Sequence, residues 1–143
     1  MEEKKNILIA DDDGTIRNAL AAVLQTENYD VRLAENGRVA VRQFLQRRPD
    51  LILLDLNMPE TDGWQAFEVM ARLAPSVPVI VITARPYQAQ RAAEVGIDML
   101  LEKPLEIPVL LETIRKLLTT PEDSRLARVL RAWHTKESVN TQR

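Results

Sequence analysis

Short, nearly uninterrupted apolar runs, separated by segments of helical periodicity, are the feature that most limits how this chain can fold. Four such runs occupy residues 7–10, 51–54, 79–82 and 99–101. Runs that do not alternate with polar residues are typical of strands buried on both faces of a parallel sheet. A fifth segment, residues 29–34, alternates apolar and polar residues and therefore predicts a half-exposed edge strand.

Apolar residues at helical spacing fill the intervals between the predicted strands. They are Ile16, Leu20, Val23 and Leu24 in the first interval, Val41, Phe44 and Leu45 in the second, Phe67 and Met70 in the third, and Ile107, Leu110, Leu111, Ile114, Leu117 and Leu118 after the last run. Residues 87–95 predict a weaker helix that stops at Gly96. The alternation predicts an α/β fold: a (βα)5 doubly wound, five-stranded parallel sheet with the flavodoxin-like strand order 2-1-3-4-5.

The composition fits one globular domain at residues 1–120 followed by a C-terminal extension at residues 121–143. The 143 residues carry a net charge of −2 and no cysteine, which excludes disulfides and gives no bulk reason to expect direct nucleic-acid binding. We expect no signal peptide and no membrane association, so the predicted location is cytoplasmic. The apolar spacing in the extension predicts a short helix followed by a disordered tail; the residues that carry it are Leu126, Val129, Leu130 and Trp133.

Polar side chains follow the central strands of the predicted sheet. They are Asp11, Asp12 and Asp13 after the first strand, Asp55 after the third, Thr83 after the fourth and Lys103 after the fifth. Ligands of open α/β sheets bind at the carboxyl ends of the strands, so these side chains are expected at one site. The first and third strands are neighbours about 4.8 Å apart in the predicted order, which crowds Asp11, Asp12 and Asp55 together. Lys103 lies two strands from Asp55, but its long stem can swing the ammonium group into the pocket.

Clustered carboxylates need a cation. Two carboxylates about 4 Å apart repel by roughly 4 kcal/mol at an effective dielectric constant of 20. A hard divalent ion with oxygen ligands relieves this repulsion, and Mg²⁺ often shares its site with phosphate. A carboxylate such as Asp55 can attack phosphorus and form an aspartyl phosphate, by a reaction that depends on positioning and charge neutralisation. Asp13 is expected to be structural, as the N-cap of the helix that begins near residues 14–15.

Four motifs, in this order and spacing, carry a resemblance to a known family. They are Ile-Leu-Ile-Ala-Asp-Asp-Asp, Leu-Leu-Asp-Leu-Asn-Met-Pro-Glu-Thr-Asp-Gly, Val-Ile-Thr-Ala and Leu-Glu-Lys-Pro. With them, about residues 5–119 resemble the receiver domain of two-component response regulators. The resemblance implies a phosphorelay signalling domain that catalyses only its own phosphorylation and dephosphorylation, and that switches the surface contacting its output partner.

The resemblance also implies a phosphoacceptor and a set of metal ligands. Asp55 would accept the phosphoryl group and share in binding Mg²⁺, with Mn²⁺ as a possible substitute. Asp12 would bind the metal directly, and Asp11 would act mainly through water. The backbone carbonyl of Asn57 would complete the protein ligands.

The remaining motif residues would contact the phosphoryl group or take part in the conformational change that follows phosphorylation. Thr83 would donate its hydroxyl to a phosphoryl oxygen, and the small Ala84 would leave room for that oxygen. Lys103 would pair with the phosphoryl group, and its bond to Pro104 is commonly cis in the family. Leu100 departs from the family pattern, because a tyrosine or phenylalanine usually stands three residues before the lysine. We therefore expect output to depend more on the backbone of residues 85–87.

The resemblance implies several partners. The only histidine, His134, lies outside every motif, so the phosphoryl donor is expected to be a sensor histidine kinase or a histidine phosphotransfer protein. The output partner is unknown from the sequence. Homodimerisation through the fourth helix, fifth strand and fifth helix is a further possibility.

Two alternatives remain open at this point. The segment from Asp11 to Thr15 also resembles the nucleophile motif of haloacid-dehalogenase-type Mg²⁺ phosphatases, with Asp11 as nucleophile and Asp13 as general acid. That family has a further pair of acids on a strand after the lysine; residues 104–143 offer no such strand, and Asp55 is left without a role. The second alternative is a degenerate receiver that acts only as a binding module, against which the complete set of motif residues argues.

Overall fold

Five parallel strands form one sheet in the order β2-β1-β3-β4-β5, which confirms the predicted topology. This is a computed structural model, and it describes residues 3–56, 63–84 and 99–121. The strands are β1 (Asn6–Ala10), β2 (Asp30–Ala34), β3 (Leu51–Asp55), β4 (Val79–Thr83) and β5 (Met99–Glu102). The strand order places β1, β3 and β4 in the interior of the sheet, where their near-continuous apolar runs are covered on both faces.

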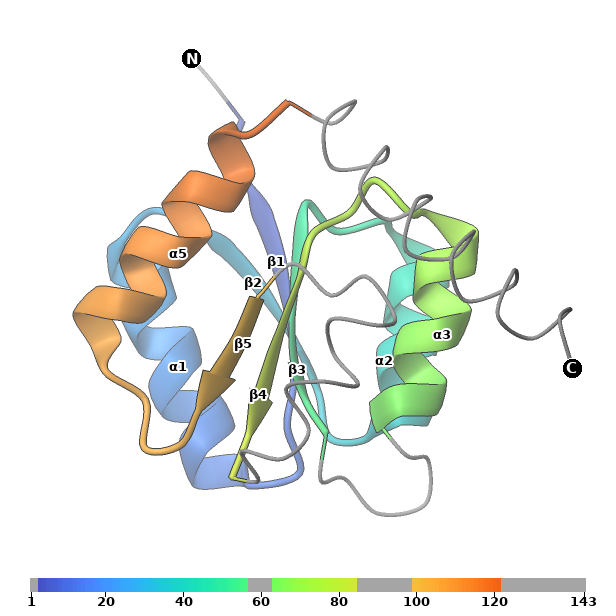
Figure 1. Cartoon of the computed structure of the whole chain (residues 1–143), viewed down its shortest axis with the longest axis horizontal. Coiled ribbons are helices and arrows are strands. Elements are labelled where there is room, and N and C mark those ends of the chain that lie inside the picture. Colours follow the sequence, from blue (N-terminus) through green and yellow to red (C-terminus); the bar gives the residue numbers. More distant parts are fainter. Residues whose placement is uncertain (1–2, 57–62, 85–98, 122–143) are drawn as a thin grey trace, which may run out of the picture.

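Helices cover both faces of the sheet (Figure 1). They are α1 (Gly14–Thr26), α2 (Gly37–Gln46), α3 (Gly63–Leu73) and α5 (Ile107–Thr119). Helices α1 and α5 pack on one face and α2 and α3 on the other, as expected for a doubly wound fold. The helix predicted at residues 87–95, its stop at Gly96 and the helix predicted in the extension lie outside the described residues.

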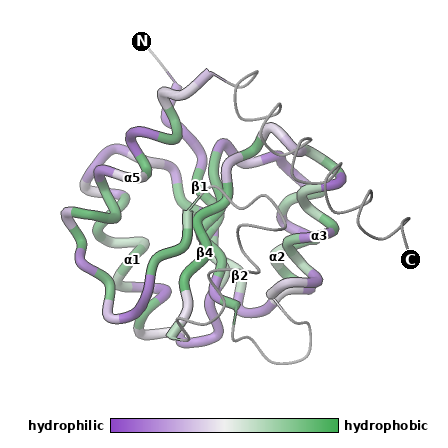
Figure 2. The backbone as a smooth tube through the Cα atoms, viewed as in Figure 1, coloured by the Kyte–Doolittle hydropathy of each residue, from purple (hydrophilic) through white to green (hydrophobic). Residues whose placement is uncertain are grey.

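The sheet separates two apolar cores, because successive strand residues point to opposite faces. In β3, for example, Leu51 and Leu53 pack toward α1 and α5, whereas Ile52 and Leu54 pack toward α2 and α3. Figure 2 shows the hydrophobic colouring concentrated along the central strands. The predicted stripe of α5 belongs to the first core, with Leu110 fully buried.

Side-chain caps fix where two of the helices begin. Asp13 caps α1, because its carboxylate accepts hydrogen bonds from the backbone N–H groups of Thr15 and Ile16. The predicted structural role of Asp13 is therefore confirmed. Asn36 caps α2 in the same way by accepting from the N–H of Val39 at 2.9 Å.

Two burial predictions are wrong. Leu45 is 65% exposed although Phe44 beside it is buried, because α2 ends at Gln46 and one step of 100° turns Leu45 away from the sheet. The apolar run at residues 99–101 predicted a strand buried on both faces, but Met99 is 41% exposed. Strand β5 lies at an edge of the sheet with β4 as its single neighbouring strand in the described sheet, so it is covered less completely than the interior strands.

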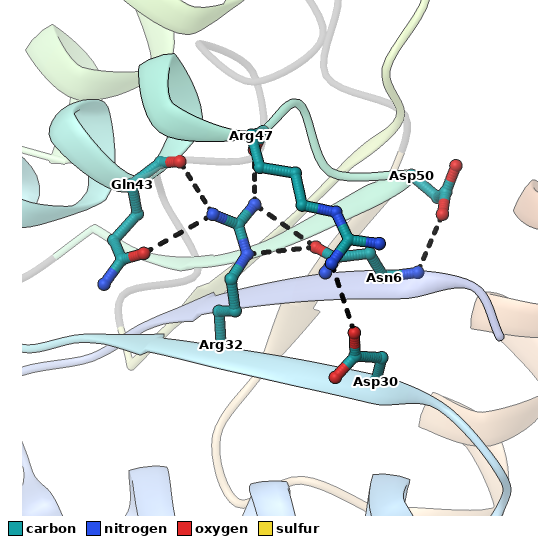
Figure 3. A network of polar contacts seen from close by, with 6 residues as sticks. All are labelled: Asn6, Asp30, Arg32, Gln43, Arg47 and Asp50. Carbon is teal, nitrogen blue, oxygen red and sulfur yellow. Dashed lines mark hydrogen bonds and ion pairs between the residues drawn. The ribbon is translucent and has the colours of Figure 1, made fainter.

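A polar network fastens the end of α2 to the amino-terminal edge of the sheet (Figure 3). The Arg32 guanidinium group donates to Asn6 Oδ1 at 3.2 Å and to the carbonyl oxygen of Gln43 at 2.8 Å, and it also bonds the carbonyl of Arg47. Carbonyls at a helix C-terminus carry partial negative charge, so a guanidinium group is a favourable partner there. The network lies at the opposite edge from the residues that follow the strands.

Candidate functional site

Three acids meet at the carboxyl-terminal edge of the sheet, as the strand order predicted. Asp55 is the last residue of β3, Asp11 directly follows β1, and each is 1% exposed; Asp12 is exposed. One carboxylate oxygen from each of Asp11, Asp12 and Asp55 lies within 4.8 Å of the others. Such a spacing allows all three to face one small cation.

Hydrogen bonds hold the backbone and one carboxylate oxygen of Asp11. Its N–H donates to the carbonyl of Ala34 at 3.1 Å, and its Oδ1 accepts from the N–H of Asp13 at 2.9 Å. Its Oδ2 is buried and accepts no hydrogen bond in the described part of the chain. A buried carboxylate oxygen without a donor is costly, and a bound cation would satisfy it.

The acids crowd one another electrostatically. The pKa of Asp11 is raised from 3.8 to about 6, chiefly because the group is buried and also because the charge of Asp55 lies nearby, whereas the hydrogen bond from Asp13 and the charge of Lys103 oppose the shift. The cluster therefore holds more negative charge than its protein surroundings neutralise. Oxygen donors with surplus negative charge fit a hard divalent metal ion.

Lys103 reaches the acids from two strands away, as predicted. Its Nζ lies 3.3 Å from Asp55 Oδ2 and 3.9 Å from Asp11 Oδ2. Its N–H donates to the carbonyl of Thr83 at 2.9 Å, which continues the pairing of β5 with β4 beyond Glu102. The bond from Lys103 to Pro104 is cis, as the resemblance implied.

The remaining predicted site residues lie in three different settings. Thr83 ends β4, is fully buried, and stands one residue beyond Ile82, the β4 partner of Asp55. Ala84 follows it and is exposed, whereas Leu100 is partly buried against the core on the α2–α3 face. Asn57 lies outside the described residues.

Gly63 is a site residue whose function the sequence analysis missed. A Cβ atom at Gly63 would lie 2.7 Å from the carbonyl oxygen of Asp55 and 2.7 Å from the Cα of Leu56. The start of α3 therefore packs directly on the backbone that carries Asp55, and only glycine allows this approach. The sequence signal was that Gly63 ends the motif that contains Asp55, but its position in the motif alone does not reveal the contact.

Comparisons with known proteins agree with this geometry. The family model of the response regulator receiver domain matches residues 7–115. Response regulator MprA of Mycolicibacterium vanbaalenii is 37% identical over 121 residues, which cover 82% of this chain and 52% of that protein. MprA of Mycobacterium bovis is 35% identical over 129 residues, covering 87% and 56% respectively. The chain thus spans about half the length of the curated relatives it matches.

Solved structures show the same fold. The receiver domain protein of Methanospirillum hungatei superposes with a TM-score of 0.77 at 27% identity, covering 85% of this chain and 96% of that one. TrrA of Thermotoga maritima superposes with a TM-score of 0.74 at 30% identity, covering 79% and 98%. Within residues 3–56, 63–84 and 99–121, none of the helices is long and apolar enough to cross a membrane. Its sequence, its strand order and its acidic edge together show that the chain belongs to the family of response regulator receiver domains.

Proposed function

We propose that Asp55 accepts a phosphoryl group from a phosphohistidine donor in a Mg²⁺-dependent reaction. One observation carries the proposal: Asp55 is buried among two further acids, with Lys103 Nζ at 3.3 Å from its Oδ2. A nucleophile, a set of oxygen ligands for a metal and a cation for the transferred group therefore meet at one point. Phosphoryl transfer needs these elements and little else, because it depends mainly on positioning and charge neutralisation.

We assign the roles of nucleophile and metal ligand to particular residues of the site. A carboxylate oxygen of Asp55 bonds to phosphorus while the bond from phosphorus to the donor's imidazole nitrogen breaks, and an ionised carboxylate needs no general base for this. Asp11, Asp12, Asp55 and the carbonyl of Asn57 would hold Mg²⁺, which neutralises charge on the transferred group when bound. Support for magnesium comes from TrrA, whose crystal structure is a complex with Mg(2+)-BeF. Mn²⁺ prefers similar oxygen ligands and is the expected substitute.

Thr83 and Lys103 would receive the phosphoryl oxygens. The Lys103 ammonium group already contacts Asp55, so it needs no large movement to pair with a phosphoryl group there. Thr83 stands at the end of the neighbouring strand with its hydroxyl as a donor, and the methyl side chain of Ala84 leaves space beside it. Leu100 supplies neither an aromatic ring nor a hydroxyl group, so the proposed readout depends more on residues 85–87.

An apolar groove beside the site suits a helical phosphoryl donor. The groove encloses about 680 Å³ between α1 and the segment joining β5 to α5; it is lined by Ile16, Ala19, Leu20, Val23, Lys103, Pro104, Leu105 and Ile107. Because Lys103 lines the groove and also contacts Asp55, a partner seated there would lie next to the phosphoacceptor. A helix of a sensor histidine kinase or histidine phosphotransfer protein fits this position.

Several properties of the protein stay predictions from the sequence. They are the domain limits at residues 1–120 and 121–143, the cytoplasmic location, the lack of direct nucleic-acid binding, homodimerisation through the fourth helix, β5 and α5, and the absence of any enzymatic activity beyond self-phosphorylation and dephosphorylation. The phosphatase alternative is not favoured, because the carboxylate of Asp13, its general acid, instead caps α1.

The proposal is tested by incubating the chain with acetyl phosphate and Mg²⁺ and measuring its intact mass. We expect one phosphoryl group on the wild-type chain and on the control Glu68→Gln, an exposed acid of α3, but none on Asp55→Asn. Phosphorylation that persists in Asp55→Asn and disappears in Asp11→Asn would favour the phosphatase alternative. No phosphorylation from acetyl phosphate or from phosphohistidine donors would favour the degenerate receiver.

A further inference from the structure

Arg17 folds back over the turn that carries the acidic cluster. Its Nη1 donates to the carbonyl oxygen of Asp11 at 2.7 Å, and a Cβ atom at Gly14 would lie 3.4 Å from its Nη2. The backbone N–H of Arg17 donates to the carbonyl of Asp13 at 2.9 Å, so the side chain starts from the first turns of α1. The guanidinium group thus joins the helix to the end of β1 across the turn between them.

The hydrogen bond from Arg17 adds a further restraint on the backbone of Asp11. The N–H of Asp11 is bonded to Ala34 and its Oδ1 to Asp13, so its carbonyl oxygen is the backbone atom that these contacts leave. Arg17 is the partner that the structure gives this oxygen. Hydrogen bonds from a charged donor are about twice as strong as neutral ones, so the bond is a firm restraint.

The restraint acts on both acids of the turn. The carbonyl of Asp11 belongs to the peptide plane that leads into Asp12, and a peptide plane turns as one unit. Fixing that plane sets the direction in which the exposed Asp12 leaves the strand. It also sets the path of the backbone toward Asp13, whose N–H holds Oδ1 of Asp11 and so leaves Oδ2 facing Lys103. We propose that Arg17 is a positioning residue that orients Asp11 and Asp12 for the divalent metal. This proposal rests on the proposed metal-dependent function.

The charge of Arg17 and its positioning role predict opposite changes in Mg²⁺ affinity when Arg17 is replaced, so the direction of the measured change tests the proposal. Removing a positive charge near three carboxylates would, by Coulomb attraction alone, strengthen Mg²⁺ binding. Removing a restraint on the ligands weakens it, and loss of such an outer partner typically costs about 10- to 100-fold in metal affinity. A weaker affinity in Arg17→Met therefore identifies the positional role.

The experiment is a Mg²⁺ titration of the full chain by calorimetry, without any phosphoryl donor. The variants are Arg17→Met, which removes the donor, and Arg17→Lys, which keeps the charge and one shorter donor; Arg42→Met, an exposed position of α2 on the other face of the sheet, removes the same charge as a control. We expect the Mg²⁺ dissociation constant to rise about tenfold or more in Arg17→Met, less in Arg17→Lys, and by less than about twofold in the control. Urea unfolding of each variant in EDTA shows that the titrated protein is folded.

A second readout separates positioning from a general loss of structure. If Arg17 acts through the metal ligands, saturating Mg²⁺ restores the rate of phosphorylation by acetyl phosphate in Arg17→Met. An Arg17→Met chain that binds Mg²⁺ as tightly as wild type, or more tightly, overturns the inference and leaves the proposed function intact. A wild-type chain that binds no Mg²⁺ overturns the proposed metal site and this inference with it.

Discussion

The carboxyl group of Asp11 should make the metal-free protein less stable as the pH rises through the weakly acidic range. Burial raises the pKa of this group from 3.8 to about 6 in the folded chain. An acid whose pKa is higher in the folded state than in the unfolded state favours unfolding once it ionises. The penalty is therefore absent below about pH 4, grows between about pH 4 and pH 6, and is complete above that range.

The size of the effect follows from the shift. The difference between 3.8 and about 6 corresponds to about 3 kcal/mol, at 1.36 kcal/mol per pKa unit. Asn in place of Asp11 resembles the protonated acid at every pH, and its side-chain oxygen can still accept the N–H of Asp13. We therefore expect Asp11→Asn to match wild type near pH 4 and to exceed its unfolding free energy by about 3 kcal/mol at pH 7.5 in EDTA.

The assay is urea unfolding of both chains in EDTA across this pH range. The difference between the two chains isolates Asp11, because all other titrating groups are shared. The exposed Asp12→Asn is the control, because it removes one charge from the same cluster and leaves the buried carboxyl group of Asp11 in place. An Asp11→Asn chain that is no more stable than wild type at pH 7.5, or a difference that does not change with pH, would refute this reasoning.

Three further outcomes are expected. Mg²⁺ affinity, measured by calorimetry, should fall as the pH drops through about 6, because protons compete with the metal for Asp11; an unchanged affinity would contradict this. Gly63→Ala should lower the unfolding free energy in urea by about 1–3 kcal/mol and slow phosphorylation by acetyl phosphate, because its Cβ would press on the backbone of Asp55; wild-type values would show that the backbone yields. Arg32→Met should cost about 1–3 kcal/mol in the same unfolding assay, because Asn6 and the end of α2 lose a charged donor; the phosphorylation rate should not change, since the network lies at the other edge of the sheet.

Much of the fold was predictable because interior strands leave a strong local signal. The run at residues 51–54 is apolar throughout, since β3 has neighbours on both sides and helices on both faces. The acidic cluster followed from strand order, because adjacent strand ends must place Asp11 and Asp55 together. The exposure of Leu45 and Met99 was not predictable from apolar character, since it depends on where α2 stops and on which strand forms the edge.

Contacts that depend on three-dimensional packing left no such signal. Arg17 looks like an ordinary charged residue of an amphipathic helix, and only its folded side-chain conformation brings it to the carbonyl of Asp11. Gly63 looks like a residue that begins a helix, and its closeness to Asp55 depends on how α3 approaches the sheet. The position of Lys103 could be predicted because long flexible stems tolerate an error of a strand width in the estimate of distance.

The two contacts of Lys103 restrict which residues could replace it. Lys103 lines the groove between α1 and the segment joining β5 to α5, while its ammonium group contacts Asp55 and Asp11. Methionine would keep the wall but lose the charge, and arginine would keep the charge but replace a compact ammonium group with a broad planar one. The proposed partner-binding groove and the proposed phosphorylation site thus share one side chain, so a change of partner that keeps the chemistry at Asp55 has to come from the other residues that line the groove.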